Sequence, residues 1–258
     1  MSLTIAVVTY NCENLLGATL SSISAFRNKW PGDIEIIAID GGSIDSTLSI
    51  LKNSNLFDSL VSEKDNGIFD AMNKAANTAA GDWICFMNAG DFFVDIEAQN
   101  LYNELSIKCV DVSVLYGDTY VVFDGETKYL KKCTSVPTLF EPMPFCHQSV
   151  FTRTELLKKF PFDPEYPRVA DQKLYMEILT SGYKFKYFPE AISTVVAEGF
   201  SSSQMNKTIS EQINLKLEFH LITKADAIRV KFRMLAIQFI KNLSPKWALK
   251  LKRRFFGV

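Results

Sequence analysis

The chain has 258 residues with a formal net charge of −1, and 47% of its residues are hydrophobic. This supplies a sizeable core and suits one large domain with an appendage or two small domains. Five scattered cysteines, without a CxxC pair or a Cys/His cluster, argue against a zinc site and are typical of reduced thiols in a cytosolic protein. We see neither a signal-peptide pattern nor an uncharged apolar window long enough for a membrane span.

The first ninety residues alternate between strand and helix patterns. Apolar runs predict strands at residues 3–10, 34–40, 58–63 and 83–87. Helical spacing of apolar residues predicts helices at 14–26 and 68–80, and a further helix opens near 43–47. Such alternation predicts an α/β fold with a parallel sheet that helices cover on both faces.

The alternation loosens after Phe93. Antiparallel strands are expected at residues 112–118, 119–123 and 127–132, with a further strand at 147–152. Helices are predicted at 171–180, about 204–222 and about 225–242. Phe92 and Phe93 are expected to be core residues rather than platforms for a ligand.

Parallel sheets of this kind bind ligands at the carboxyl ends of their strands. Four polar segments follow the predicted strands, at residues 9–11, 40–42, 63–66 and 88–91. The first strand leads into TYNCEN, so neither a GxGxxG dinucleotide motif nor a GxxxxGKS/T phosphate loop is present there. The acids in these segments instead favour a divalent metal that bridges protein carboxylate and ligand phosphate.

The segment Asn88-Ala89-Gly90-Asp91 suits that arrangement. Asp91 is the predicted ligand of Mg²⁺ or Mn²⁺, and Gly90 removes a side chain where a pyrophosphate must approach closely. Asn88 would position a ribose hydroxyl or a metal-bound water. A surface turn is the plain alternative for Asp91, although a turn acid needs no buried strand before it.

Several stretches, in this order, resemble the family-two inverting glycosyltransferases, which have the GT-A fold: VVTYN, IAIDGGSIDST, SEKDNGIFDAMNKAANTAAGDWICFMNAGDFF, HQSVF and VADQKLYMEIL. The resemblance covers about residues 1–200 and is strongest to bacterial enzymes that build O-antigen, capsule or exopolysaccharide. It implies a Rossmann-like, mostly parallel sheet, a nucleotide-diphosphate sugar as donor, and Mn²⁺ or Mg²⁺ as cofactor.

The resemblance also implies roles for individual residues at the strand ends. Thr9 and Asn11 would contact the nucleotide, and Asp40 would accept a hydrogen bond from the base. The rest of the nucleotide-sugar pocket is assigned to Asp65, Asp70, Asn73, Asn88, Ala89 and Gly90. The family's first motif aspartate is replaced by Asn88, so Asp91 must carry most of the metal binding. By position alone, Asp40 and Asp65 are as readily explained as turn formers.

Asp171 matches the family's catalytic base, which takes the proton of the acceptor hydroxyl as it attacks the anomeric carbon. By position alone, an N-cap of the helix that begins there is the plainer explanation. His147 and Gln148 resemble a motif near the donor or acceptor pocket. By itself, His147 would more often be a hydrogen-bonded core histidine.

The C-terminal part has a different charge from the rest. Residues 224–258 carry ten Lys/Arg and one acid, for a net charge of +9 against −10 for residues 1–223. Basic helices with interleaved aromatic residues favour an anionic membrane surface. A helix packed on the catalytic domain is the alternative, and the acidic body disfavours nucleic acid.

We therefore expect three parts: a nucleotide-sugar half at residues 1–100, an acceptor half of the same domain at 101–203, and a basic helical extension at 204–258. The expected reaction moves a hexose or N-acetylhexosamine from a UDP-linked donor to a sugar on a polyprenyl-pyrophosphate carrier. The expected location is the inner face of the plasma membrane. The oligomeric state is not predicted, and a homodimer is one option.

A catalytically silent nucleotide-sugar-binding scaffold is the second hypothesis for the function. A nucleotidyltransferase is the third, disfavoured because TYNCEN is not a Gly-rich basic loop.

Overall fold

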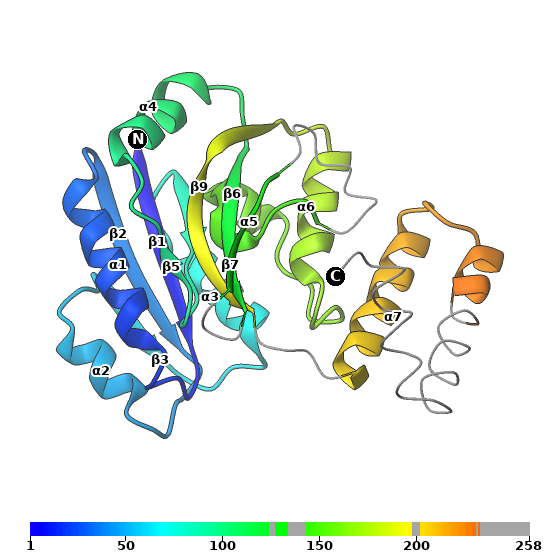
Figure 1. Ribbon diagram of the computed structural model, residues 1–258, viewed down its shortest axis with the longest axis horizontal. Coiled ribbons are helices and arrows are strands. Elements are labelled where there is room, and N and C mark those ends of the chain that lie inside the picture. The colour runs from blue at the N-terminus through cyan, green and yellow to red at the C-terminus, as the bar shows by residue number, and fades with distance from the viewer. Residues whose placement is uncertain (124–126, 134–142, 198–201, 231, 233–258) are drawn as a thin grey trace. The chain divides into compact units, whose positions relative to one another are not determined.

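The computed structural model describes residues 1–123, 127–133, 143–197, 202–230 and 232. It separates into two units, Met1–Met205 and Asn206–Val258. The first unit contains the sheet (Figure 1). In the second unit, residues 224–230 are helical, and the remainder of the helix expected at 225–242 lies almost wholly outside the described residues.

The parallel half of the sheet consists of β1 (Ser2–Thr9), β2 (Asp33–Asp40), β3 (Ser59–Ser62) and β4 (Trp83–Phe86), in the order β3-β2-β1-β4. Seven of the eight residues of β1 are buried. This burial explains its unbroken apolar run, because a central parallel strand is covered on both faces. The four strands predicted in this region are confirmed, and so is their parallel pairing.

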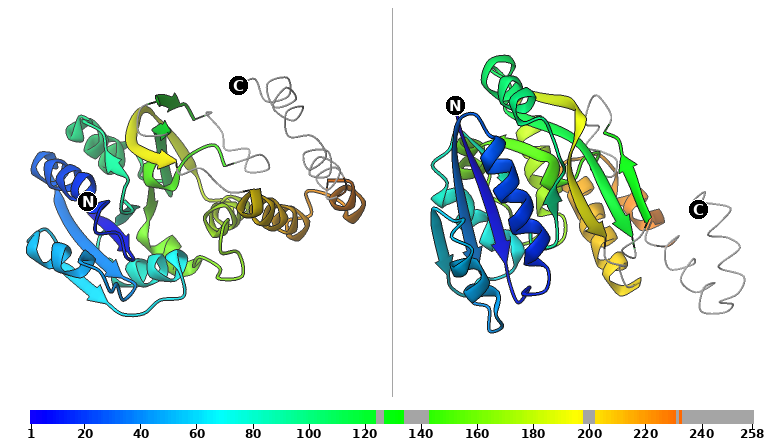
Figure 2. Two further views of the ribbon diagram at one scale, coloured as in Figure 1. Left: turned by 60° about the horizontal axis from the view of Figure 1, so that its bottom comes forward. Right: turned by 60° about the vertical axis from the view of Figure 1, so that its left-hand side comes forward.

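The second half of the sheet extends from β4 through β8 (Val150–Arg153), β6 (Val114–Phe123) and β9 (Phe185–Ala197) to β5 (Phe92–Phe93). β9 curves beside β6 over their whole length (Figure 1). The hairpin strand β7 (Thr127–Lys131) pairs with β6. The described residues therefore form one sheet with both parallel and antiparallel pairs, and helices lie around it (Figure 2).

Two predictions in this half were wrong. The two strands predicted at 112–118 and 119–123 are one strand, β6, which begins at Val114 and whose pairing with β9 shifts in register around Gly117 and Asp118. A Cβ at Gly117 would lie 2.8 Å from the backbone carbonyl oxygen of Glu190 on β9, so the close approach of the two strands requires glycine there. The predicted strand at 147–152 begins instead with a 3₁₀ turn, His147–Ser149. The strand β9 was not predicted at all.

The helices around the sheet are α1 (Leu16–Lys29), α2 (Thr47–Asn53), α3 (Ile68–Thr78), α4 (Ala98–Asn103), α5 (Thr154–Lys159) and α6 (Ala170–Thr180), with a π-helical turn at Glu104–Lys108. α7 (Ser202–Glu218) crosses from the first unit into the second. α1 packs Ile23 and Phe26 into the main core, where Phe26 stacks on Phe93 at 4.3 Å. Phe93 is thus a core residue, as predicted.

Candidate active site

The first group of site residues lies where β1 and β2 end. Asp40 is fully buried, and its carboxylate accepts hydrogen bonds from Thr9 Oγ1 at 3.2 Å, Ser62 Oγ at 2.7 Å, and both the hydroxyl and the N–H of Ser43. Burial by itself would raise the pKa of Asp40, but the hydrogen bonds from Ser43, Ser62 and Thr9 outweigh it and hold the pKa below its usual range. Asp40 therefore joins the ends of three adjacent strands.

Asn11 fastens the loop after β1 to the loop after β2. Its N–H donates to Ser43 Oγ at 2.8 Å, and its Oδ1 accepts the N–H of Ile44 at 2.9 Å. The backbone of Asn11 is left-handed, with φ 44°, which asparagine tolerates better than most residues. The two loops that were expected to contact a nucleotide are thus held in one arrangement.

Asp65 lies directly over the backbone of Gly41. A Cβ built on Gly41 would be 2.2 Å from Asp65 Oδ2, so a larger residue there would displace the carboxylate from this position. Asp65 Oδ1 also accepts the N–H of Gly67 at 2.9 Å, and Asp70 accepts the N–H of Asn66 at 2.9 Å at the start of α3. Both acids order the loop between β3 and α3.

Asn73 lies apart from this group. Its amide donates to the carbonyl oxygen of Phe162 and accepts the N–H of the same residue, both at 2.8 Å. In this structure Asn73 holds the segment that leads to α6, a role that its place in a helix pattern gave no reason to expect.

The second group begins at the loop after β4. Gly90 has φ +96°, a conformation that side chains other than glycine rarely adopt. Thr19 of α1 accepts the N–H of Gly90 at 3.0 Å and donates to the carbonyl oxygen of Asp91 at 2.7 Å. Thr19 was not predicted as a site residue, although a polar residue on the apolar face of a helix was a signal that could have found it.

The carboxylate of Asp91 is buried and bonded on both oxygens. Gln148 Nε2 donates to Oδ2 at 2.6 Å, and the N–H of Val196 on β9 donates to Oδ1 at 3.2 Å. Burial raises the pKa of Asp91 above its usual range, and these hydrogen bonds offset the rise only in part. The segment that supplies Asp91 and the motif that supplies Gln148 are therefore in direct contact.

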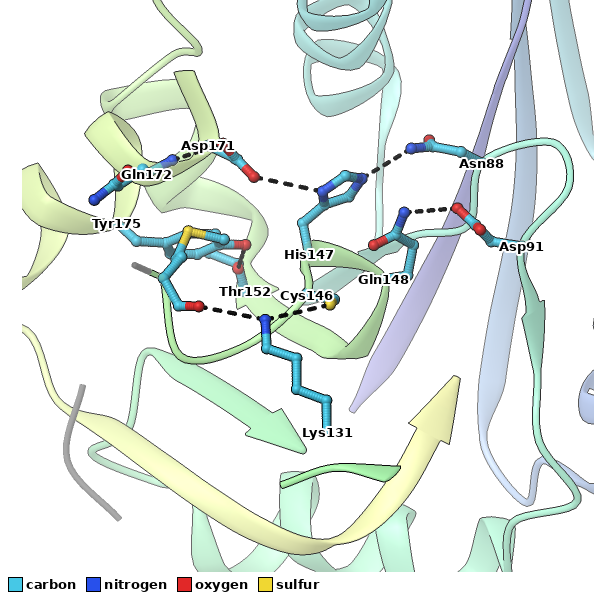
Figure 3. Close-up of polar contacts among 11 residues, drawn as sticks. Asn88, Asp91, Lys131, Cys146, His147, Gln148, Thr152, Asp171, Gln172 and Tyr175 are labelled. Carbon is cyan, nitrogen blue, oxygen red and sulfur yellow. Dashed lines mark hydrogen bonds and ion pairs between the residues drawn. The ribbon is translucent and has the colours of Figure 1, made fainter. Parts of the chain in front are cut away.

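His147 connects the strand-end loop with α6. Its Nε2 lies 2.8 Å from Asn88 Nδ2, and its Nδ1 lies 3.5 Å from Asp171 Oδ2 (Figure 3). Asp171 is not the N-cap of α6, because the cap position is Val169, and Asp171 Oδ1 accepts the N–H of Gln172 at 2.8 Å. Asn88, Asp91, His147, Gln148 and Asp171 thus meet in one cluster, which we call the His147 cluster.

Lys131 approaches the same region from β7. Its Nζ donates to the carbonyl oxygen of Met143 at 3.4 Å and contacts Cys146 Sγ at 3.7 Å (Figure 3). It was not predicted, because a lysine in a surface hairpin carries no signal in the sequence.

A divalent metal is compatible with the oxygen donors of this loop. Asn88 Oδ1 is buried and has no hydrogen-bond partner among the described residues, and the carboxylate of Asp91 is three positions away. Amide and carboxylate oxygens are the ligands that Mg²⁺ and Mn²⁺ prefer. Within the described part of the chain, no three His, Cys, Asp or Glu side chains gather into a metal cluster, so substrate oxygens would have to supply further ligands.

The chain is similar to known proteins in both sequence and structure. Residues 4–160 match the model of glycosyl transferase family 2. A PGL/p-HBAD biosynthesis glycosyltransferase of Mycobacterium bovis is 28% identical over 172 residues. The match covers 65% of this chain and 65% of the relative, so the chain spans just under two thirds of the length of that relative.

Solved structures share the fold at low identity. TarS of Staphylococcus aureus in complex with UDP superposes with a TM-score of 0.62 at 19% identity, over 84% of this chain and 66% of that one. The mannosyltransferase PcManGT of Pyrobaculum calidifontis, in complex with GDP-Man and Mn²⁺, gives a TM-score of 0.60 at 17% identity, over 86% of this chain and 65% of that one. These neighbours have the GT-A fold, which confirms the expected fold class. The chain belongs to glycosyl transferase family 2.

Proposed function

We propose that this protein is an inverting glycosyltransferase that moves a hexose or an N-acetylhexosamine from a nucleotide-diphosphate sugar, UDP-linked, to a sugar hydroxyl. The observation that carries the proposal is the His147 cluster, in which the acid expected to act as base and the loop expected to meet the diphosphate are joined through one side chain. Membership of the family and the nucleotide ligands named for the structural neighbours support the donor class.

The proposed reaction is a single displacement. The acceptor hydroxyl oxygen forms a bond to the anomeric carbon, and the bond from that carbon to the diphosphate oxygen breaks. The electron pair leaves with the nucleoside diphosphate, and the hydroxyl proton passes to the carboxylate of Asp171. Attack opposite the leaving group inverts the anomeric configuration.

Asp91 would hold Mn²⁺ or Mg²⁺ together with Asn88 Oδ1, and the bound ion would stabilise negative charge on the leaving diphosphate. The chain itself contributes a loop after β4 that is held in one conformation. Thr19 holds the backbone of Gly90 and Asp91, and Gln148 holds the carboxylate. A preorganised loop lowers the entropy lost when the donor binds.

We propose a polyprenyl-pyrophosphate-linked saccharide as the acceptor, reached from the cytoplasmic face of a membrane. The support is the positive charge of residues 224–258, which would attract an anionic surface with about 1 kcal/mol per Lys or Arg near it. No helix in the described part of the chain is both long enough and apolar enough to span a bilayer.

A donor screen tests the proposed function. The purified chain is titrated with UDP, GDP, CMP and dTDP and their sugars, with Mn²⁺ and with EDTA, while thermal unfolding is followed. Binding to the folded state raises its stability by about 2.7 kcal/mol at a ligand concentration of 100 Kd. We expect the uridine series to stand out in Mn²⁺.

The outcome decides between the proposal and its rival. If no nucleotide shifts the unfolding temperature, the nucleotide-sugar site is wrong. Binding without any transfer to lipid-linked acceptors would favour the catalytically silent scaffold, for which the replacement of the first motif aspartate by Asn88 is the specific motive.

A further inference from the structure

His147 is held in place by its neighbours on both sides. It opens the 3₁₀ turn that leads into β8, and β8 pairs with β4, the strand that delivers Asn88. In the same turn, Gln148 is buried against Asp91, and Ser149 is buried with hydrogen bonds to Thr119 and Ser193. The imidazole therefore projects from a rigid base, with only 18% of the side chain exposed.

The two ring nitrogens of His147 have different partners. Asn88 Nδ2 donates to Nε2 at 2.8 Å, so Nε2 is the acceptor nitrogen of the ring. In a neutral imidazole the proton then resides on Nδ1, which is the nitrogen that faces Asp171 Oδ2 at 3.5 Å. Asn88 thus selects the tautomer that presents an N–H to the carboxylate.

We propose that His147 is a positioning residue for Asp171, and this inference rests on the proposed function. The Nδ1–H of His147 would donate to Asp171 Oδ2 in the substrate complex, where catalytic hydrogen bonds commonly shorten from their length in the free enzyme. Asp171 Oδ1 already accepts the N–H of Gln172. The carboxylate would then be fixed from two sides, and Oδ2 would keep a lone pair for the proton of the acceptor hydroxyl.

The same contacts argue against His147 as the proton acceptor. Its only lone pair on a ring nitrogen is at Nε2, which Asn88 occupies, and Nδ1 carries the proton. Neither nitrogen can accept a proton from the substrate while the contact with Asn88 persists. His147 therefore acts through Asp171.

Two substitutions separate the two contacts of the ring. In His147→Asn, the side-chain amide nitrogen takes the place of Nδ1 and keeps a donor toward Asp171. In His147→Gln, the amide reaches the place of Nε2 and keeps the contact with Asn88, while the donor toward Asp171 is lost. His220→Asn is the matched control, because His220 is the second of the two histidines and is exposed.

We expect His147→Gln and His147→Ala to lower kcat by about 100-fold, the loss that a misplacement of about 1 Å can cause. The KM for the donor should stay within about twofold, and His147→Asn should recover at least a tenth of the wild-type kcat. His220→Asn should match the wild type. Equal losses for Asn, Gln and Ala, in variants that unfold at the wild-type temperature, would overturn the proposal, as would full activity of His147→Gln.

A second measurement does not depend on activity. Long-range ¹H–¹⁵N NMR of the full chain at mildly alkaline pH reports which imidazole nitrogen is protonated, and the His220→Asn chain leaves only the His147 signal. We expect the Nδ1–H tautomer and a changed Nδ1 shift in Asp171→Asn. An Nε2–H tautomer would overturn the positioning role. Lack of nucleotide binding would instead overturn the proposed function and leave the NMR result unchanged, so the two failures are distinguishable.

Discussion

The side chain of Asn73 holds the backbone of Phe162 at two points, with both hydrogen bonds 2.8 Å long and the partners 89 positions apart in the sequence. Phe162 is buried and stacks on Phe69 of α3. Because the chain runs from Phe162 into α6, this contact connects the helix after β3 with the segment that carries Asp171.

Replacing Asn73 by alanine should destabilise the protein by about 2 kcal/mol, since two hydrogen bonds at about 1 kcal/mol each are lost. It should also lower the transfer rate, because the segment before α6 is released. Urea unfolding measures the first effect and steady-state kinetics the second. Asn28→Ala is the control, because Asn28 is an exposed residue on α1, and its change should stay within about 0.5 kcal/mol.

Asp171→Asn should lower kcat by about 10²- to 10⁴-fold, the range contributed by a general base. Nucleotide binding should be unchanged, because the substitution removes a proton acceptor and keeps the shape of the side chain. Isothermal titration with the nucleotide and a transfer assay on the same sample check both statements. Glu165→Gln, an exposed acid before α6, serves as the control. A variant that retains most of the wild-type kcat would remove Asp171 from the mechanism.

Asp91 and Asp40 should respond in opposite ways to the same Asp→Asn change. The pKa of Asp91 is raised by burial, so its charged form destabilises the folded state at neutral pH. Asp91→Asn should therefore raise the free energy of unfolding at pH 7 while it abolishes transfer. The gain should shrink as the pH falls through the raised pKa and vanish below the ordinary value for aspartate.

The pKa of Asp40 is lowered because its hydrogen bonds outweigh burial. Its contribution to stability is complete above the ordinary pKa of aspartate and is lost as the pH falls through the lowered pKa. Asp40→Asn places an amide N–H₂ group among donors from Ser43 and Ser62, and should cost about 2–3 kcal/mol at pH 7. Urea unfolding of both variants from pH 3 to pH 8 tests the pair. If both substitutions changed the free energy of unfolding in the same direction at pH 7, the opposite pKa shifts assigned to Asp91 and Asp40 would be wrong.

Gly41→Ala should weaken nucleotide binding, because the new Cβ would lie 2.2 Å from Asp65 Oδ2 and displace the Asp65 carboxylate, which orders the loop after β3 through Gly67. The matched control is Gly17→Ala in α1, where a Cβ meets nothing within 4 Å. That substitution should stabilise the chain by about 0.5–1 kcal/mol, through the helix preference for alanine over glycine. Calorimetric titration compares the affinities. An unchanged affinity in Gly41→Ala would separate Asp65 from the nucleotide site.

The basic C-terminal residues should bind anionic vesicles in a salt-dependent manner. The full chain should sediment with phosphatidylglycerol-containing liposomes at low salt and be released at high salt, because screening shortens the range of the attraction to about 3 Å at 1 M. Neutral phosphatidylcholine vesicles are the control. Failure to sediment at low salt would exclude the membrane surface as a partner of residues 224–258.

The amino-acid pattern was sufficient to predict the parallel half of the fold, and it indicated the sheet edge where the candidate site lies. Buried parallel strands such as β1 need apolar residues on both faces, so the strand is visible as an unbroken apolar run, and the polar residues after it mark the ligand edge. Gly90 was predicted to leave room for a pyrophosphate, and its φ of +96° is a second reason for glycine at that position.

Which of these residues meet could not be predicted, because it depends on contacts between segments that are far apart in the sequence. β9 was missed because its sequence, FKYFPEAISTVVA, contains a proline and has no clear alternation, although its pairing with β6 supplies the N–H that reaches Asp91. Asp91 contacts Gln148, and His147 contacts Asp171. The partners in each pair are too far apart in the sequence for a helix or strand period to relate them. Local sequence patterns reflect backbone periodicity and burial. The partners of these side chains are instead set by the order of the strands in the sheet and by the paths of the loops between them.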